Sequence, residues 1–120
     1  MIPLKEGSYY VEDGFLKAGE QTLGLFDIVI TVWADKSGTK RLKGRARLNN
    51  YKFAMMLEDV DDDEVDVVLW LGHGFGLYLT EPPIQGGRLM TEDTEASILF
   101  SEGEKVRLFE DDEWESLRPD

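Results

Sequence analysis

The chain has 120 residues, of which 42% are hydrophobic, and its formal net charge is −12. This length accommodates one domain with a core of its own, and the apolar content argues against general disorder. The chain contains no cysteine, which excludes disulfide scaffolds, thiol nucleophiles and thiolate metal sites.

The two ends of the chain and its longest apolar run carry further expectations. We predict a single β domain over residues 1–109, followed by an acidic, mobile tail over residues 110–120. The first ten residues lack the basic and apolar regions of a signal peptide, and the apolar run 67–71 is too short to span a bilayer. We therefore expect a cytoplasmic protein with no membrane role.

Short strands are expected along nearly the whole chain. In order, they cover residues 9–12, 15–17, 26–33, 41–48, 51–57, 65–71, 75–80, 88–91, 96–100 and 105–109. A turn is expected at Asn49-Asn50, because asparagine tolerates positive φ, and a helix is expected only near the C-terminus. The pattern predicts an all-β fold, an antiparallel meander of about 8–10 strands that forms a small barrel or a sandwich.

The segment 26–48 predicts a β-hairpin. From residue 26 to 33, β-branched and apolar residues alternate with their neighbours in the period of two that a strand requires. After turn residues at 35–40, the even positions from 42 to 48 are apolar or small, and the odd positions from 41 to 47 are basic. One face of the second strand should therefore be basic, and Trp33 should share that face from the first strand.

Charge is divided unevenly between the two halves of the sequence. Residues 1–57 carry nine Lys/Arg and six Asp/Glu (+3), whereas residues 58–120 carry four Lys/Arg and nineteen Asp/Glu (−15). Two interpretations stay open. Either the fold pairs these charges across neighbouring strands, or the surface has one pole that attracts anions and another that attracts cationic proteins.

The acidic run from Glu58 to Asp66 suggests a calcium loop, but its spacing does not match one. An EF-hand that starts at Asp59 needs a glycine at its sixth position and a glutamate at its twelfth, where this chain has Glu64 and Trp70. A weak, irregular calcium site stays open, because clustered carboxylates attract hard cations. We interpret the run as an acidic hairpin loop and predict no metal centre.

The segment Gly72-His73-Gly74-Phe75-Gly76 holds the chain's single histidine. Phosphate-binding loops lead from a strand into a helix, whereas here a second strand pattern follows, so the glycines predict a tight turn. No nucleophile-elbow motif or other catalytic signature is present, and a carboxylate pair for glycoside hydrolysis cannot be recognised from sequence. We predict no enzymatic activity and no cofactor.

Our leading hypothesis is a binding module that engages a protein partner through acidic surfaces. In character, such a small acidic β protein resembles phage-encoded inhibitors and nucleic-acid mimics, including anti-CRISPR and anti-restriction proteins. Charge would steer the encounter and an exposed aromatic ring would anchor it. The residues predicted for this role are Glu58, Asp59, Asp61, Asp62, Asp63, Glu64, Asp66, Asp111, Asp112, Glu113 and Trp114.

The alternative hypothesis is a β-barrel that binds single-stranded nucleic acid, since cations beside aromatic rings meet both phosphates and bases. Tyr51 or Phe53 would add a second stacking surface. With its acidic tail, this layout resembles single-strand binding proteins, although Arg118-Pro119-Asp120 replaces the terminal hydrophobic residue expected of such tails. The predicted nucleic-acid face consists of Trp33, Lys40, Arg41, Lys43, Arg45, Arg47 and Lys52. A second alternative is a barrel that holds a small apolar ligand in its interior.

Overall fold

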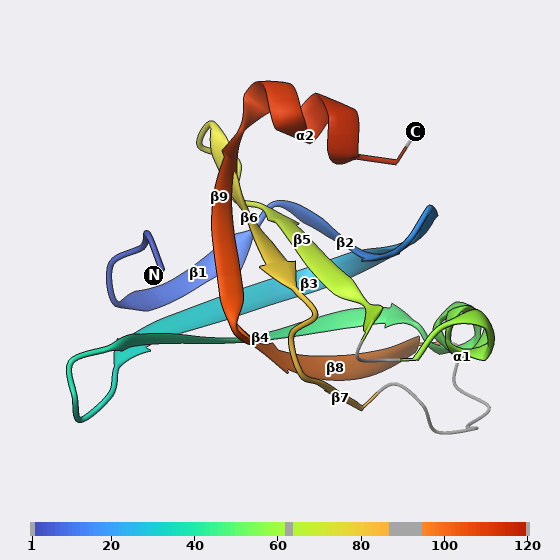
Figure 1. Cartoon of the computed structure of the whole chain (residues 1–120), viewed down its shortest axis with the longest axis horizontal. Helices are drawn as coiled ribbons and strands as arrows, with labels where there is room; N and C mark the ends of the chain where they lie inside the picture. The colour runs from blue at the N-terminus through green and yellow to red at the C-terminus, as the bar shows by residue number, and fades with distance from the viewer. Residues whose placement is uncertain (1, 62–63, 87–94, 120) are drawn as a thin grey trace.

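A single antiparallel sheet, curled into a half-barrel, forms most of the structure (Figure 1). The computed structural model describes residues 2–61, 64–86 and 95–119. Within this part of the chain the elements are β1 (Gly7–Val11), β2 (Asp13–Ala18), β3 (Gln21–Ala34), β4 (Lys40–Asn49), α1 (Asn50–Asp59), β5 (Asp66–Trp70), β6 (Phe75–Thr80), β7 (Ile84–Gly86), β8 (Glu95–Ser101), β9 (Lys105–Glu110) and α2 (Asp111–Leu117). The predicted all-β, antiparallel, single-domain fold is confirmed.

The long strand β3 connects two halves of the sheet. Its first residues, 21–25, pair with β2, and its later residues pair with β1 on one side and with β4 on the other. The strand order is β7-β8-β4-β3-β2-β5-β6-β9, and β1 lies beside β3 outside this path. We call β1, the later part of β3, β4, β8 and β7 half-sheet A, and we call β2, the first part of β3, β5, β6 and β9 half-sheet B.

A bulge in β3 separates its two parts. Asp27 adopts a positive φ of 52°, and the pairing of β3 with β4 shifts between Phe26 and Val29. The inward positions are therefore Leu23 and Leu25 before the bulge and Ile28, Ile30 and Val32 after it. Phe26, which a regular alternation places inward with Ile28, is exposed instead, because the extra residue reverses the faces of the strand.

The core lies on the inner face of the curled sheet. As predicted, Leu42, Ala46 and Leu48 of β4 point into it, while the basic residues between them face outward. On β5, Val67, Val68 and Leu69 are all fully buried, which confirms the expectation of a central strand. Helix α2 covers part of the outer side of half-sheet B and buries Phe15, Val68 and Phe109 there, whereas the outer face of half-sheet A is open to solvent.

The prediction of a strand at residues 51–57 is wrong, because this segment forms helix α1. Asn49 does not make a turn between strands. Its side-chain oxygen accepts a hydrogen bond from the backbone N–H of Lys52 at 2.9 Å, which caps the helix. Phe53 and Met56, one helical turn apart, both point into the core. A spacing of three residues was present in the sequence, but it was too short a pattern to outweigh the apparent alternation.

Strand β3 begins five residues before its predicted start at residue 26, and β7 was not predicted, whereas four other strands lie close to their predicted positions. Strand β6 has the predicted bounds, and β5, β8 and β9 differ from theirs by one residue at one or both ends. The glycine-rich segment forms the turn between β5 and β6, with Gly72 and Gly74 both at a φ of 87°. The strand predicted at residues 88–91 lies outside the described residues.

The segment predicted to be a mobile tail is part of the folded structure up to Leu117. Glu110 ends β9, and α2 follows it directly. Trp114 of α2 is 5% exposed and packs against Phe15, Trp70 and Phe109 on the outer face of half-sheet B. Trp114 is therefore not the exposed anchor that the acidic-surface hypothesis requires.

Candidate functional site

Four cations stand in a row on the outer face of β4. Arg41, Lys43, Arg45 and Arg47 occupy alternate positions, and all four are exposed, as the alternation predicts. Cross-strand neighbours in half-sheet A place other side chains on the same face. Tyr10 lies opposite Val29, Val29 lies opposite Arg45, and Arg45 lies opposite Leu99, so these four residues form one line across β1, β3, β4 and β8. We call this outer surface of half-sheet A the basic face.

The two cations at the ends of the row are held by carboxylates. Arg41 Nε lies 2.6 Å from Oε1 of Glu102, a buried carboxylate that also accepts a hydrogen bond from the backbone N–H of Leu42. The hydrogen bond and the negative charge of Glu102 raise the pKa of Arg41. Arg47 Nη2 lies 2.5 Å from Glu95 Oε2, and its Nη1 lies 3.8 Å from Asp27 Oδ2. Part of the charge split seen in the sequence is thus neutralised inside the fold.

The two cations in the middle of the row are placed differently. Within residues 2–61, 64–86 and 95–119, no ion pair joins Lys43 or Arg45 to a carboxylate. Lys43 Nζ lies 5.6 Å from the centre of the Trp33 ring, a distance at which a cation is attracted to the ring face. The centre of the basic face therefore offers two positive charges to a ligand.

Aromatic rings accompany these cations. Tyr10 is 89% exposed and Trp33 is 38% exposed. At the far end of the row, the Phe26 ring lies 5.8 Å from the guanidinium of Arg47. Leu99, 56% exposed, adds an apolar surface on the opposite side of β4 from Tyr10. Rings thus lie beside Lys43 and Arg47, and Tyr10 adds a third ring on β1.

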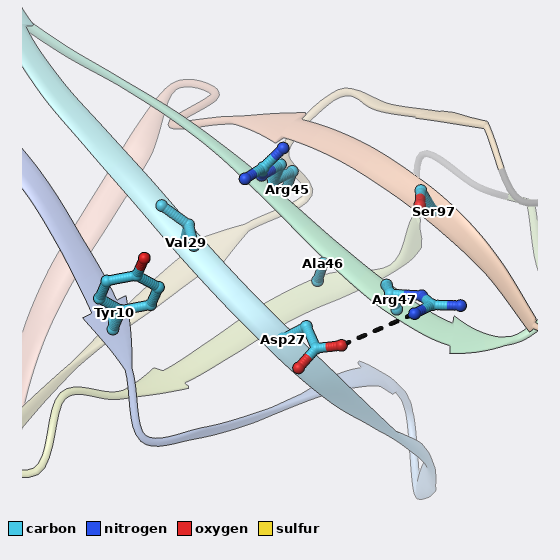
Figure 2. Close-up of a pocket in the computed structure, with 7 residues that line it drawn as sticks. All are labelled: Tyr10, Asp27, Val29, Arg45, Ala46, Arg47 and Ser97. Carbon is cyan, nitrogen blue, oxygen red and sulfur yellow. Dashed lines mark ion pairs between the residues drawn. The ribbon is translucent and has the colours of Figure 1, made fainter.

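Three shallow hollows follow the middle of the basic face. One, of about 360 Å³, has a lining that includes Tyr10, Asp27, Val29, Arg45 and Arg47, and Figure 2 shows these side chains on β1, β3 and β4. A second, of about 430 Å³, shares Val29 and Arg45 with the first. A third, of about 210 Å³, shares Lys43 and Leu99 with the second and reaches Gln85 on β7. Because neighbouring hollows share lining residues, the three lie next to one another on the basic face.

Not every predicted residue of the nucleic-acid face lies there. Lys40, the first residue of β4, is exposed, but it alternates with the cations of the row, and its Nζ donates to the backbone carbonyl of Leu4 at 2.6 Å. Lys52 and Tyr51 lie on α1, and Phe53 is buried in the core, so it provides no stacking surface. Conversely, the prediction did not include Tyr10 and Leu99. Their sequence positions carried no signal for this face, because the pairing of β1 with β3 and of β8 with β4 joins distant segments.

The predicted acidic residues fall into two separate groups. Glu58, Asp59, Asp61 and Glu64 surround the end of α1, near the start of β5, whereas Asp111, Asp112 and Glu113 lie in α2, which packs over the end of β5 at Trp70. Figure 1 shows the two helices well apart, with α2 at the top of the view and α1 at the lower right. Asp62 and Asp63 lie outside the described residues. The acidic run 58–66 is also not the hairpin loop that was predicted, because Glu58 and Asp59 are the last two residues of helix α1.

Asp66 and Glu113 belong to a polar network on the outer face of half-sheet B. Tyr78 Oη donates to Asp66 Oδ2 at 2.5 Å, and the guanidinium of Arg107 lies 5.0 Å from the centre of the Tyr78 ring. Arg107 also makes a two-pronged ion pair with Glu113, with both N–O distances at 2.7 Å. This pair lowers the pKa of Glu113 and raises that of Arg107. The network links β5, β6, β9 and α2, so these two acids serve the fold.

The pKa of Tyr78 leads to a testable pH dependence. Burial, and then the hydrogen bond to Asp66, raise it above the ordinary value of tyrosine. The stability that this neutral phenol contributes is complete below about pH 10, where tyrosine in the unfolded chain is protonated, and is lost as the pH rises further. Between about pH 9 and about pH 11, the urea midpoint of the wild type should fall more than that of Tyr78→Phe.

A matched variant controls for the other groups that titrate in this range. Tyr51→Phe removes a hydroxyl from an exposed ring and should show the same fall as the wild type. If the urea midpoint of Tyr78→Phe fell as much as that of the wild type over this pH range, Tyr78 would not be the group responsible for the loss of stability.

Comparison with known proteins gave no match: no family model, no curated protein and no solved structure matches the chain. In the described part of the chain, neither helix has the length and apolar character needed to cross a membrane.

Proposed function

We propose that this protein is a non-catalytic binding module that holds single-stranded nucleic acid on the basic face. The observation that carries the proposal is the position of Lys43 and Arg45, which form no ion pair within the described residues and lie among the exposed rings of Tyr10 and Trp33. Positive charges pair with phosphates, and rings stack on bases whatever the sequence. This was the alternative hypothesis at the level of sequence.

The spacing of the side chains suits an extended ligand that runs along β4. Alternate residues of a strand are about 7 Å apart. Along this direction the basic face presents Trp33, then Lys43, then Arg45, and then Phe26, while Tyr10 lies two strands from Arg45, across Val29. Two of the hollows lie along the central part of this path. A strand of nucleic acid laid along it would meet rings and cations in turn.

The net charge of the protein limits the expected affinity. A chain at −12 repels a polyphosphate at long range, so attraction arises only close to the basic face. With two cations available, the logarithm of the affinity should fall with a slope of about −1.4 against the logarithm of the salt concentration. Affinity should therefore fall about sevenfold for a fourfold rise in salt.

Titration with oligo-dT of about 12 nucleotides tests the proposal. At low salt, the oligonucleotide should quench the fluorescence of Trp33, and the affinity should show the salt dependence given above. Trp33→Phe should lose most of the quenching while fluorescence anisotropy of a labelled oligonucleotide still reports binding, because Trp70 and Trp114 lie on the other half of the sheet. A flat titration by both methods at low salt would overturn the proposal.

An acidic surface for a protein partner is a second candidate. Its support is the group at the end of α1, where Glu58, Asp59, Asp61 and Glu64 are exposed and form no ion pair with a cation in the described part of the chain. Such a group attracts a basic partner surface. A pull-down from host lysate with the wild type and with Glu58→Gln, Asp59→Asn and Asp61→Asn combined tests it. The same partners recovered with both proteins would remove this candidate.

The interior of the half-barrel does not favour the third hypothesis, an internal apolar ligand. Its largest side chains, including Phe53, Leu42 and Leu69, are fully buried and belong to one continuous cluster. Side chains therefore occupy the space that a ligand would take in a ligand-binding barrel.

A further inference from the structure

One carboxylate stands within the basic face itself. Asp27 lies in the bulge of β3, and its side chain is 69% exposed. Neighbouring residues of a regular strand point to opposite faces, but the bulge leaves the side chains of Phe26 and Asp27 both exposed. A negative charge at this place weakens the attraction of phosphate, so Asp27 contributes nothing to the binding of a nucleic-acid backbone.

The oxygens of Asp27 are not taken up by the protein. The nearest cation is Nη1 of Arg47, which lies 3.8 Å from Asp27 Oδ2, longer than a hydrogen bond, and Arg47 is held on its other nitrogen by Glu95. Within the described residues, no group donates a hydrogen bond to the carboxylate of Asp27. Both oxygens can therefore accept from a ligand.

The hollow of about 360 Å³ beside Asp27 has the parts of a site for a nucleic-acid base. Tyr10 on β1 and Arg45 on β4 stand on either side of Val29, whose shorter side chain forms the floor between them. Two strand spacings, about 10 Å, separate the outer two backbones, which leaves room for a flat ring above Val29. Tyr10 is 89% exposed and offers a ring for stacking. Figure 2 shows Asp27 on β3 beside this floor.

The hydrogen-bonding edges of the bases decide which one suits a carboxylate. Guanine presents two adjacent donors, N1–H and the N2 amino group, and a carboxylate accepts from both at once. Adenine and cytosine each place an acceptor nitrogen beside their amino group, and thymine has one N–H between two carbonyl oxygens. Those acceptors would face the negative charge of Asp27. Guanine alone among the four matches both of its oxygens.

We propose that this hollow is a guanine subsite of the basic face, in which the ring of Tyr10 stacks on the base and Asp27 accepts from N1–H and the N2 amino group. This subsite rests on the proposed binding of single-stranded nucleic acid and adds a base preference to it. Stacking tolerates every base, so Asp27 is the source of the preference. Lys43 and Arg45, next along the basic face, hold the phosphates.

Fluorescence anisotropy with three labelled oligonucleotides of about 12 nucleotides tests the subsite. One is oligo-dT, the second carries a single guanine at its centre, and the third carries hypoxanthine there, which is guanine without its N2 amino group. The wild type should bind the guanine oligonucleotide at least about fivefold more tightly than oligo-dT, as expected for a bidentate contact to a base, with the hypoxanthine oligonucleotide in between. Asp27→Asn should lose this preference. Asparagine, like aspartate, tolerates the positive φ of 52° at this position.

Glu20→Gln is the matched control. It removes the same charge from the turn between β2 and β3, away from the hollow, and should keep the preference for guanine. If the wild type bound the guanine oligonucleotide and oligo-dT equally, the guanine subsite would be wrong while the proposed function stood. A preference that survived in Asp27→Asn, or a hypoxanthine oligonucleotide that bound as tightly as the guanine one, would also overturn the subsite. No binding of any of the three at low salt would overturn the subsite and the proposed function together.

Discussion

Replacement of Phe53 by alanine is expected to lower the free energy of unfolding by about 4 kcal/mol. The ring is fully buried in the main core and joins α1 to the inner face of the sheet. Its removal forfeits the transfer free energy of the ring and leaves a cavity under the helix. Urea denaturation followed by circular dichroism should show the loss as a lower midpoint with a similar slope.

Tyr51→Ala is the matched control for this change. It removes a ring of similar size from the same helix, but Tyr51 is exposed, so the free energy of unfolding should change by less than about 1 kcal/mol. Equal losses for the two variants would contradict the packing of α1 through Phe53.

The double variant Lys43→Gln, Arg45→Gln is expected to weaken binding of oligo-dT by about 30-fold at low salt. The estimate assigns roughly 1 kcal/mol to each lost phosphate contact. The slope of the salt dependence should approach zero, because these are the two cations of the row that no described carboxylate holds. Both side chains are exposed, so the urea midpoint should stay close to that of the wild type.

Lys105→Gln, Arg118→Gln separates the effect of the basic face from that of net charge. It makes the same change in net charge on β9 and after α2, away from half-sheet A. Affinity should change by less than about twofold if local contacts dominate. Equal weakening by the two double variants would show that net charge, not the basic face, controls binding, and no weakening by the first would remove the basic face as the site.

Local regularity explains which parts of the fold were predictable. The alternation in β4 placed Leu42 and Leu48 inside and Arg41 and Arg47 outside, because the period of two in a strand is a local property. The same reasoning failed for residues 51–57, where the alternation was accidental. The helix there depends on the cap at Asn49 and on burial of Phe53 against strands distant in sequence.

The candidate site was predictable only in part, because only some of its residues belong to a local pattern in the sequence. The row of cations on β4 and the ring of Trp33 followed from one hairpin, whose two strands are neighbours in sequence. Tyr10 and Leu99 come from strands that pair with this hairpin over long separations, and no local pattern indicates such pairing. The bulge at Asp27, which turns Phe26 outward, likewise exists only in the paired sheet.

The sequence by itself determined the class of the fold, the basic side of β4 and the absence of cysteine chemistry, because these depend on residue types and on local period. Only the tertiary structure decided which charges are neutralised. Glu102, directly after β8, reaches Arg41, and Glu95, the first residue of β8, reaches Arg47. Lys43 and Arg45 between them have no such partners in the described residues. It also decided that Trp114 is buried among other aromatic rings, because its contacts come from β2, β5 and β9.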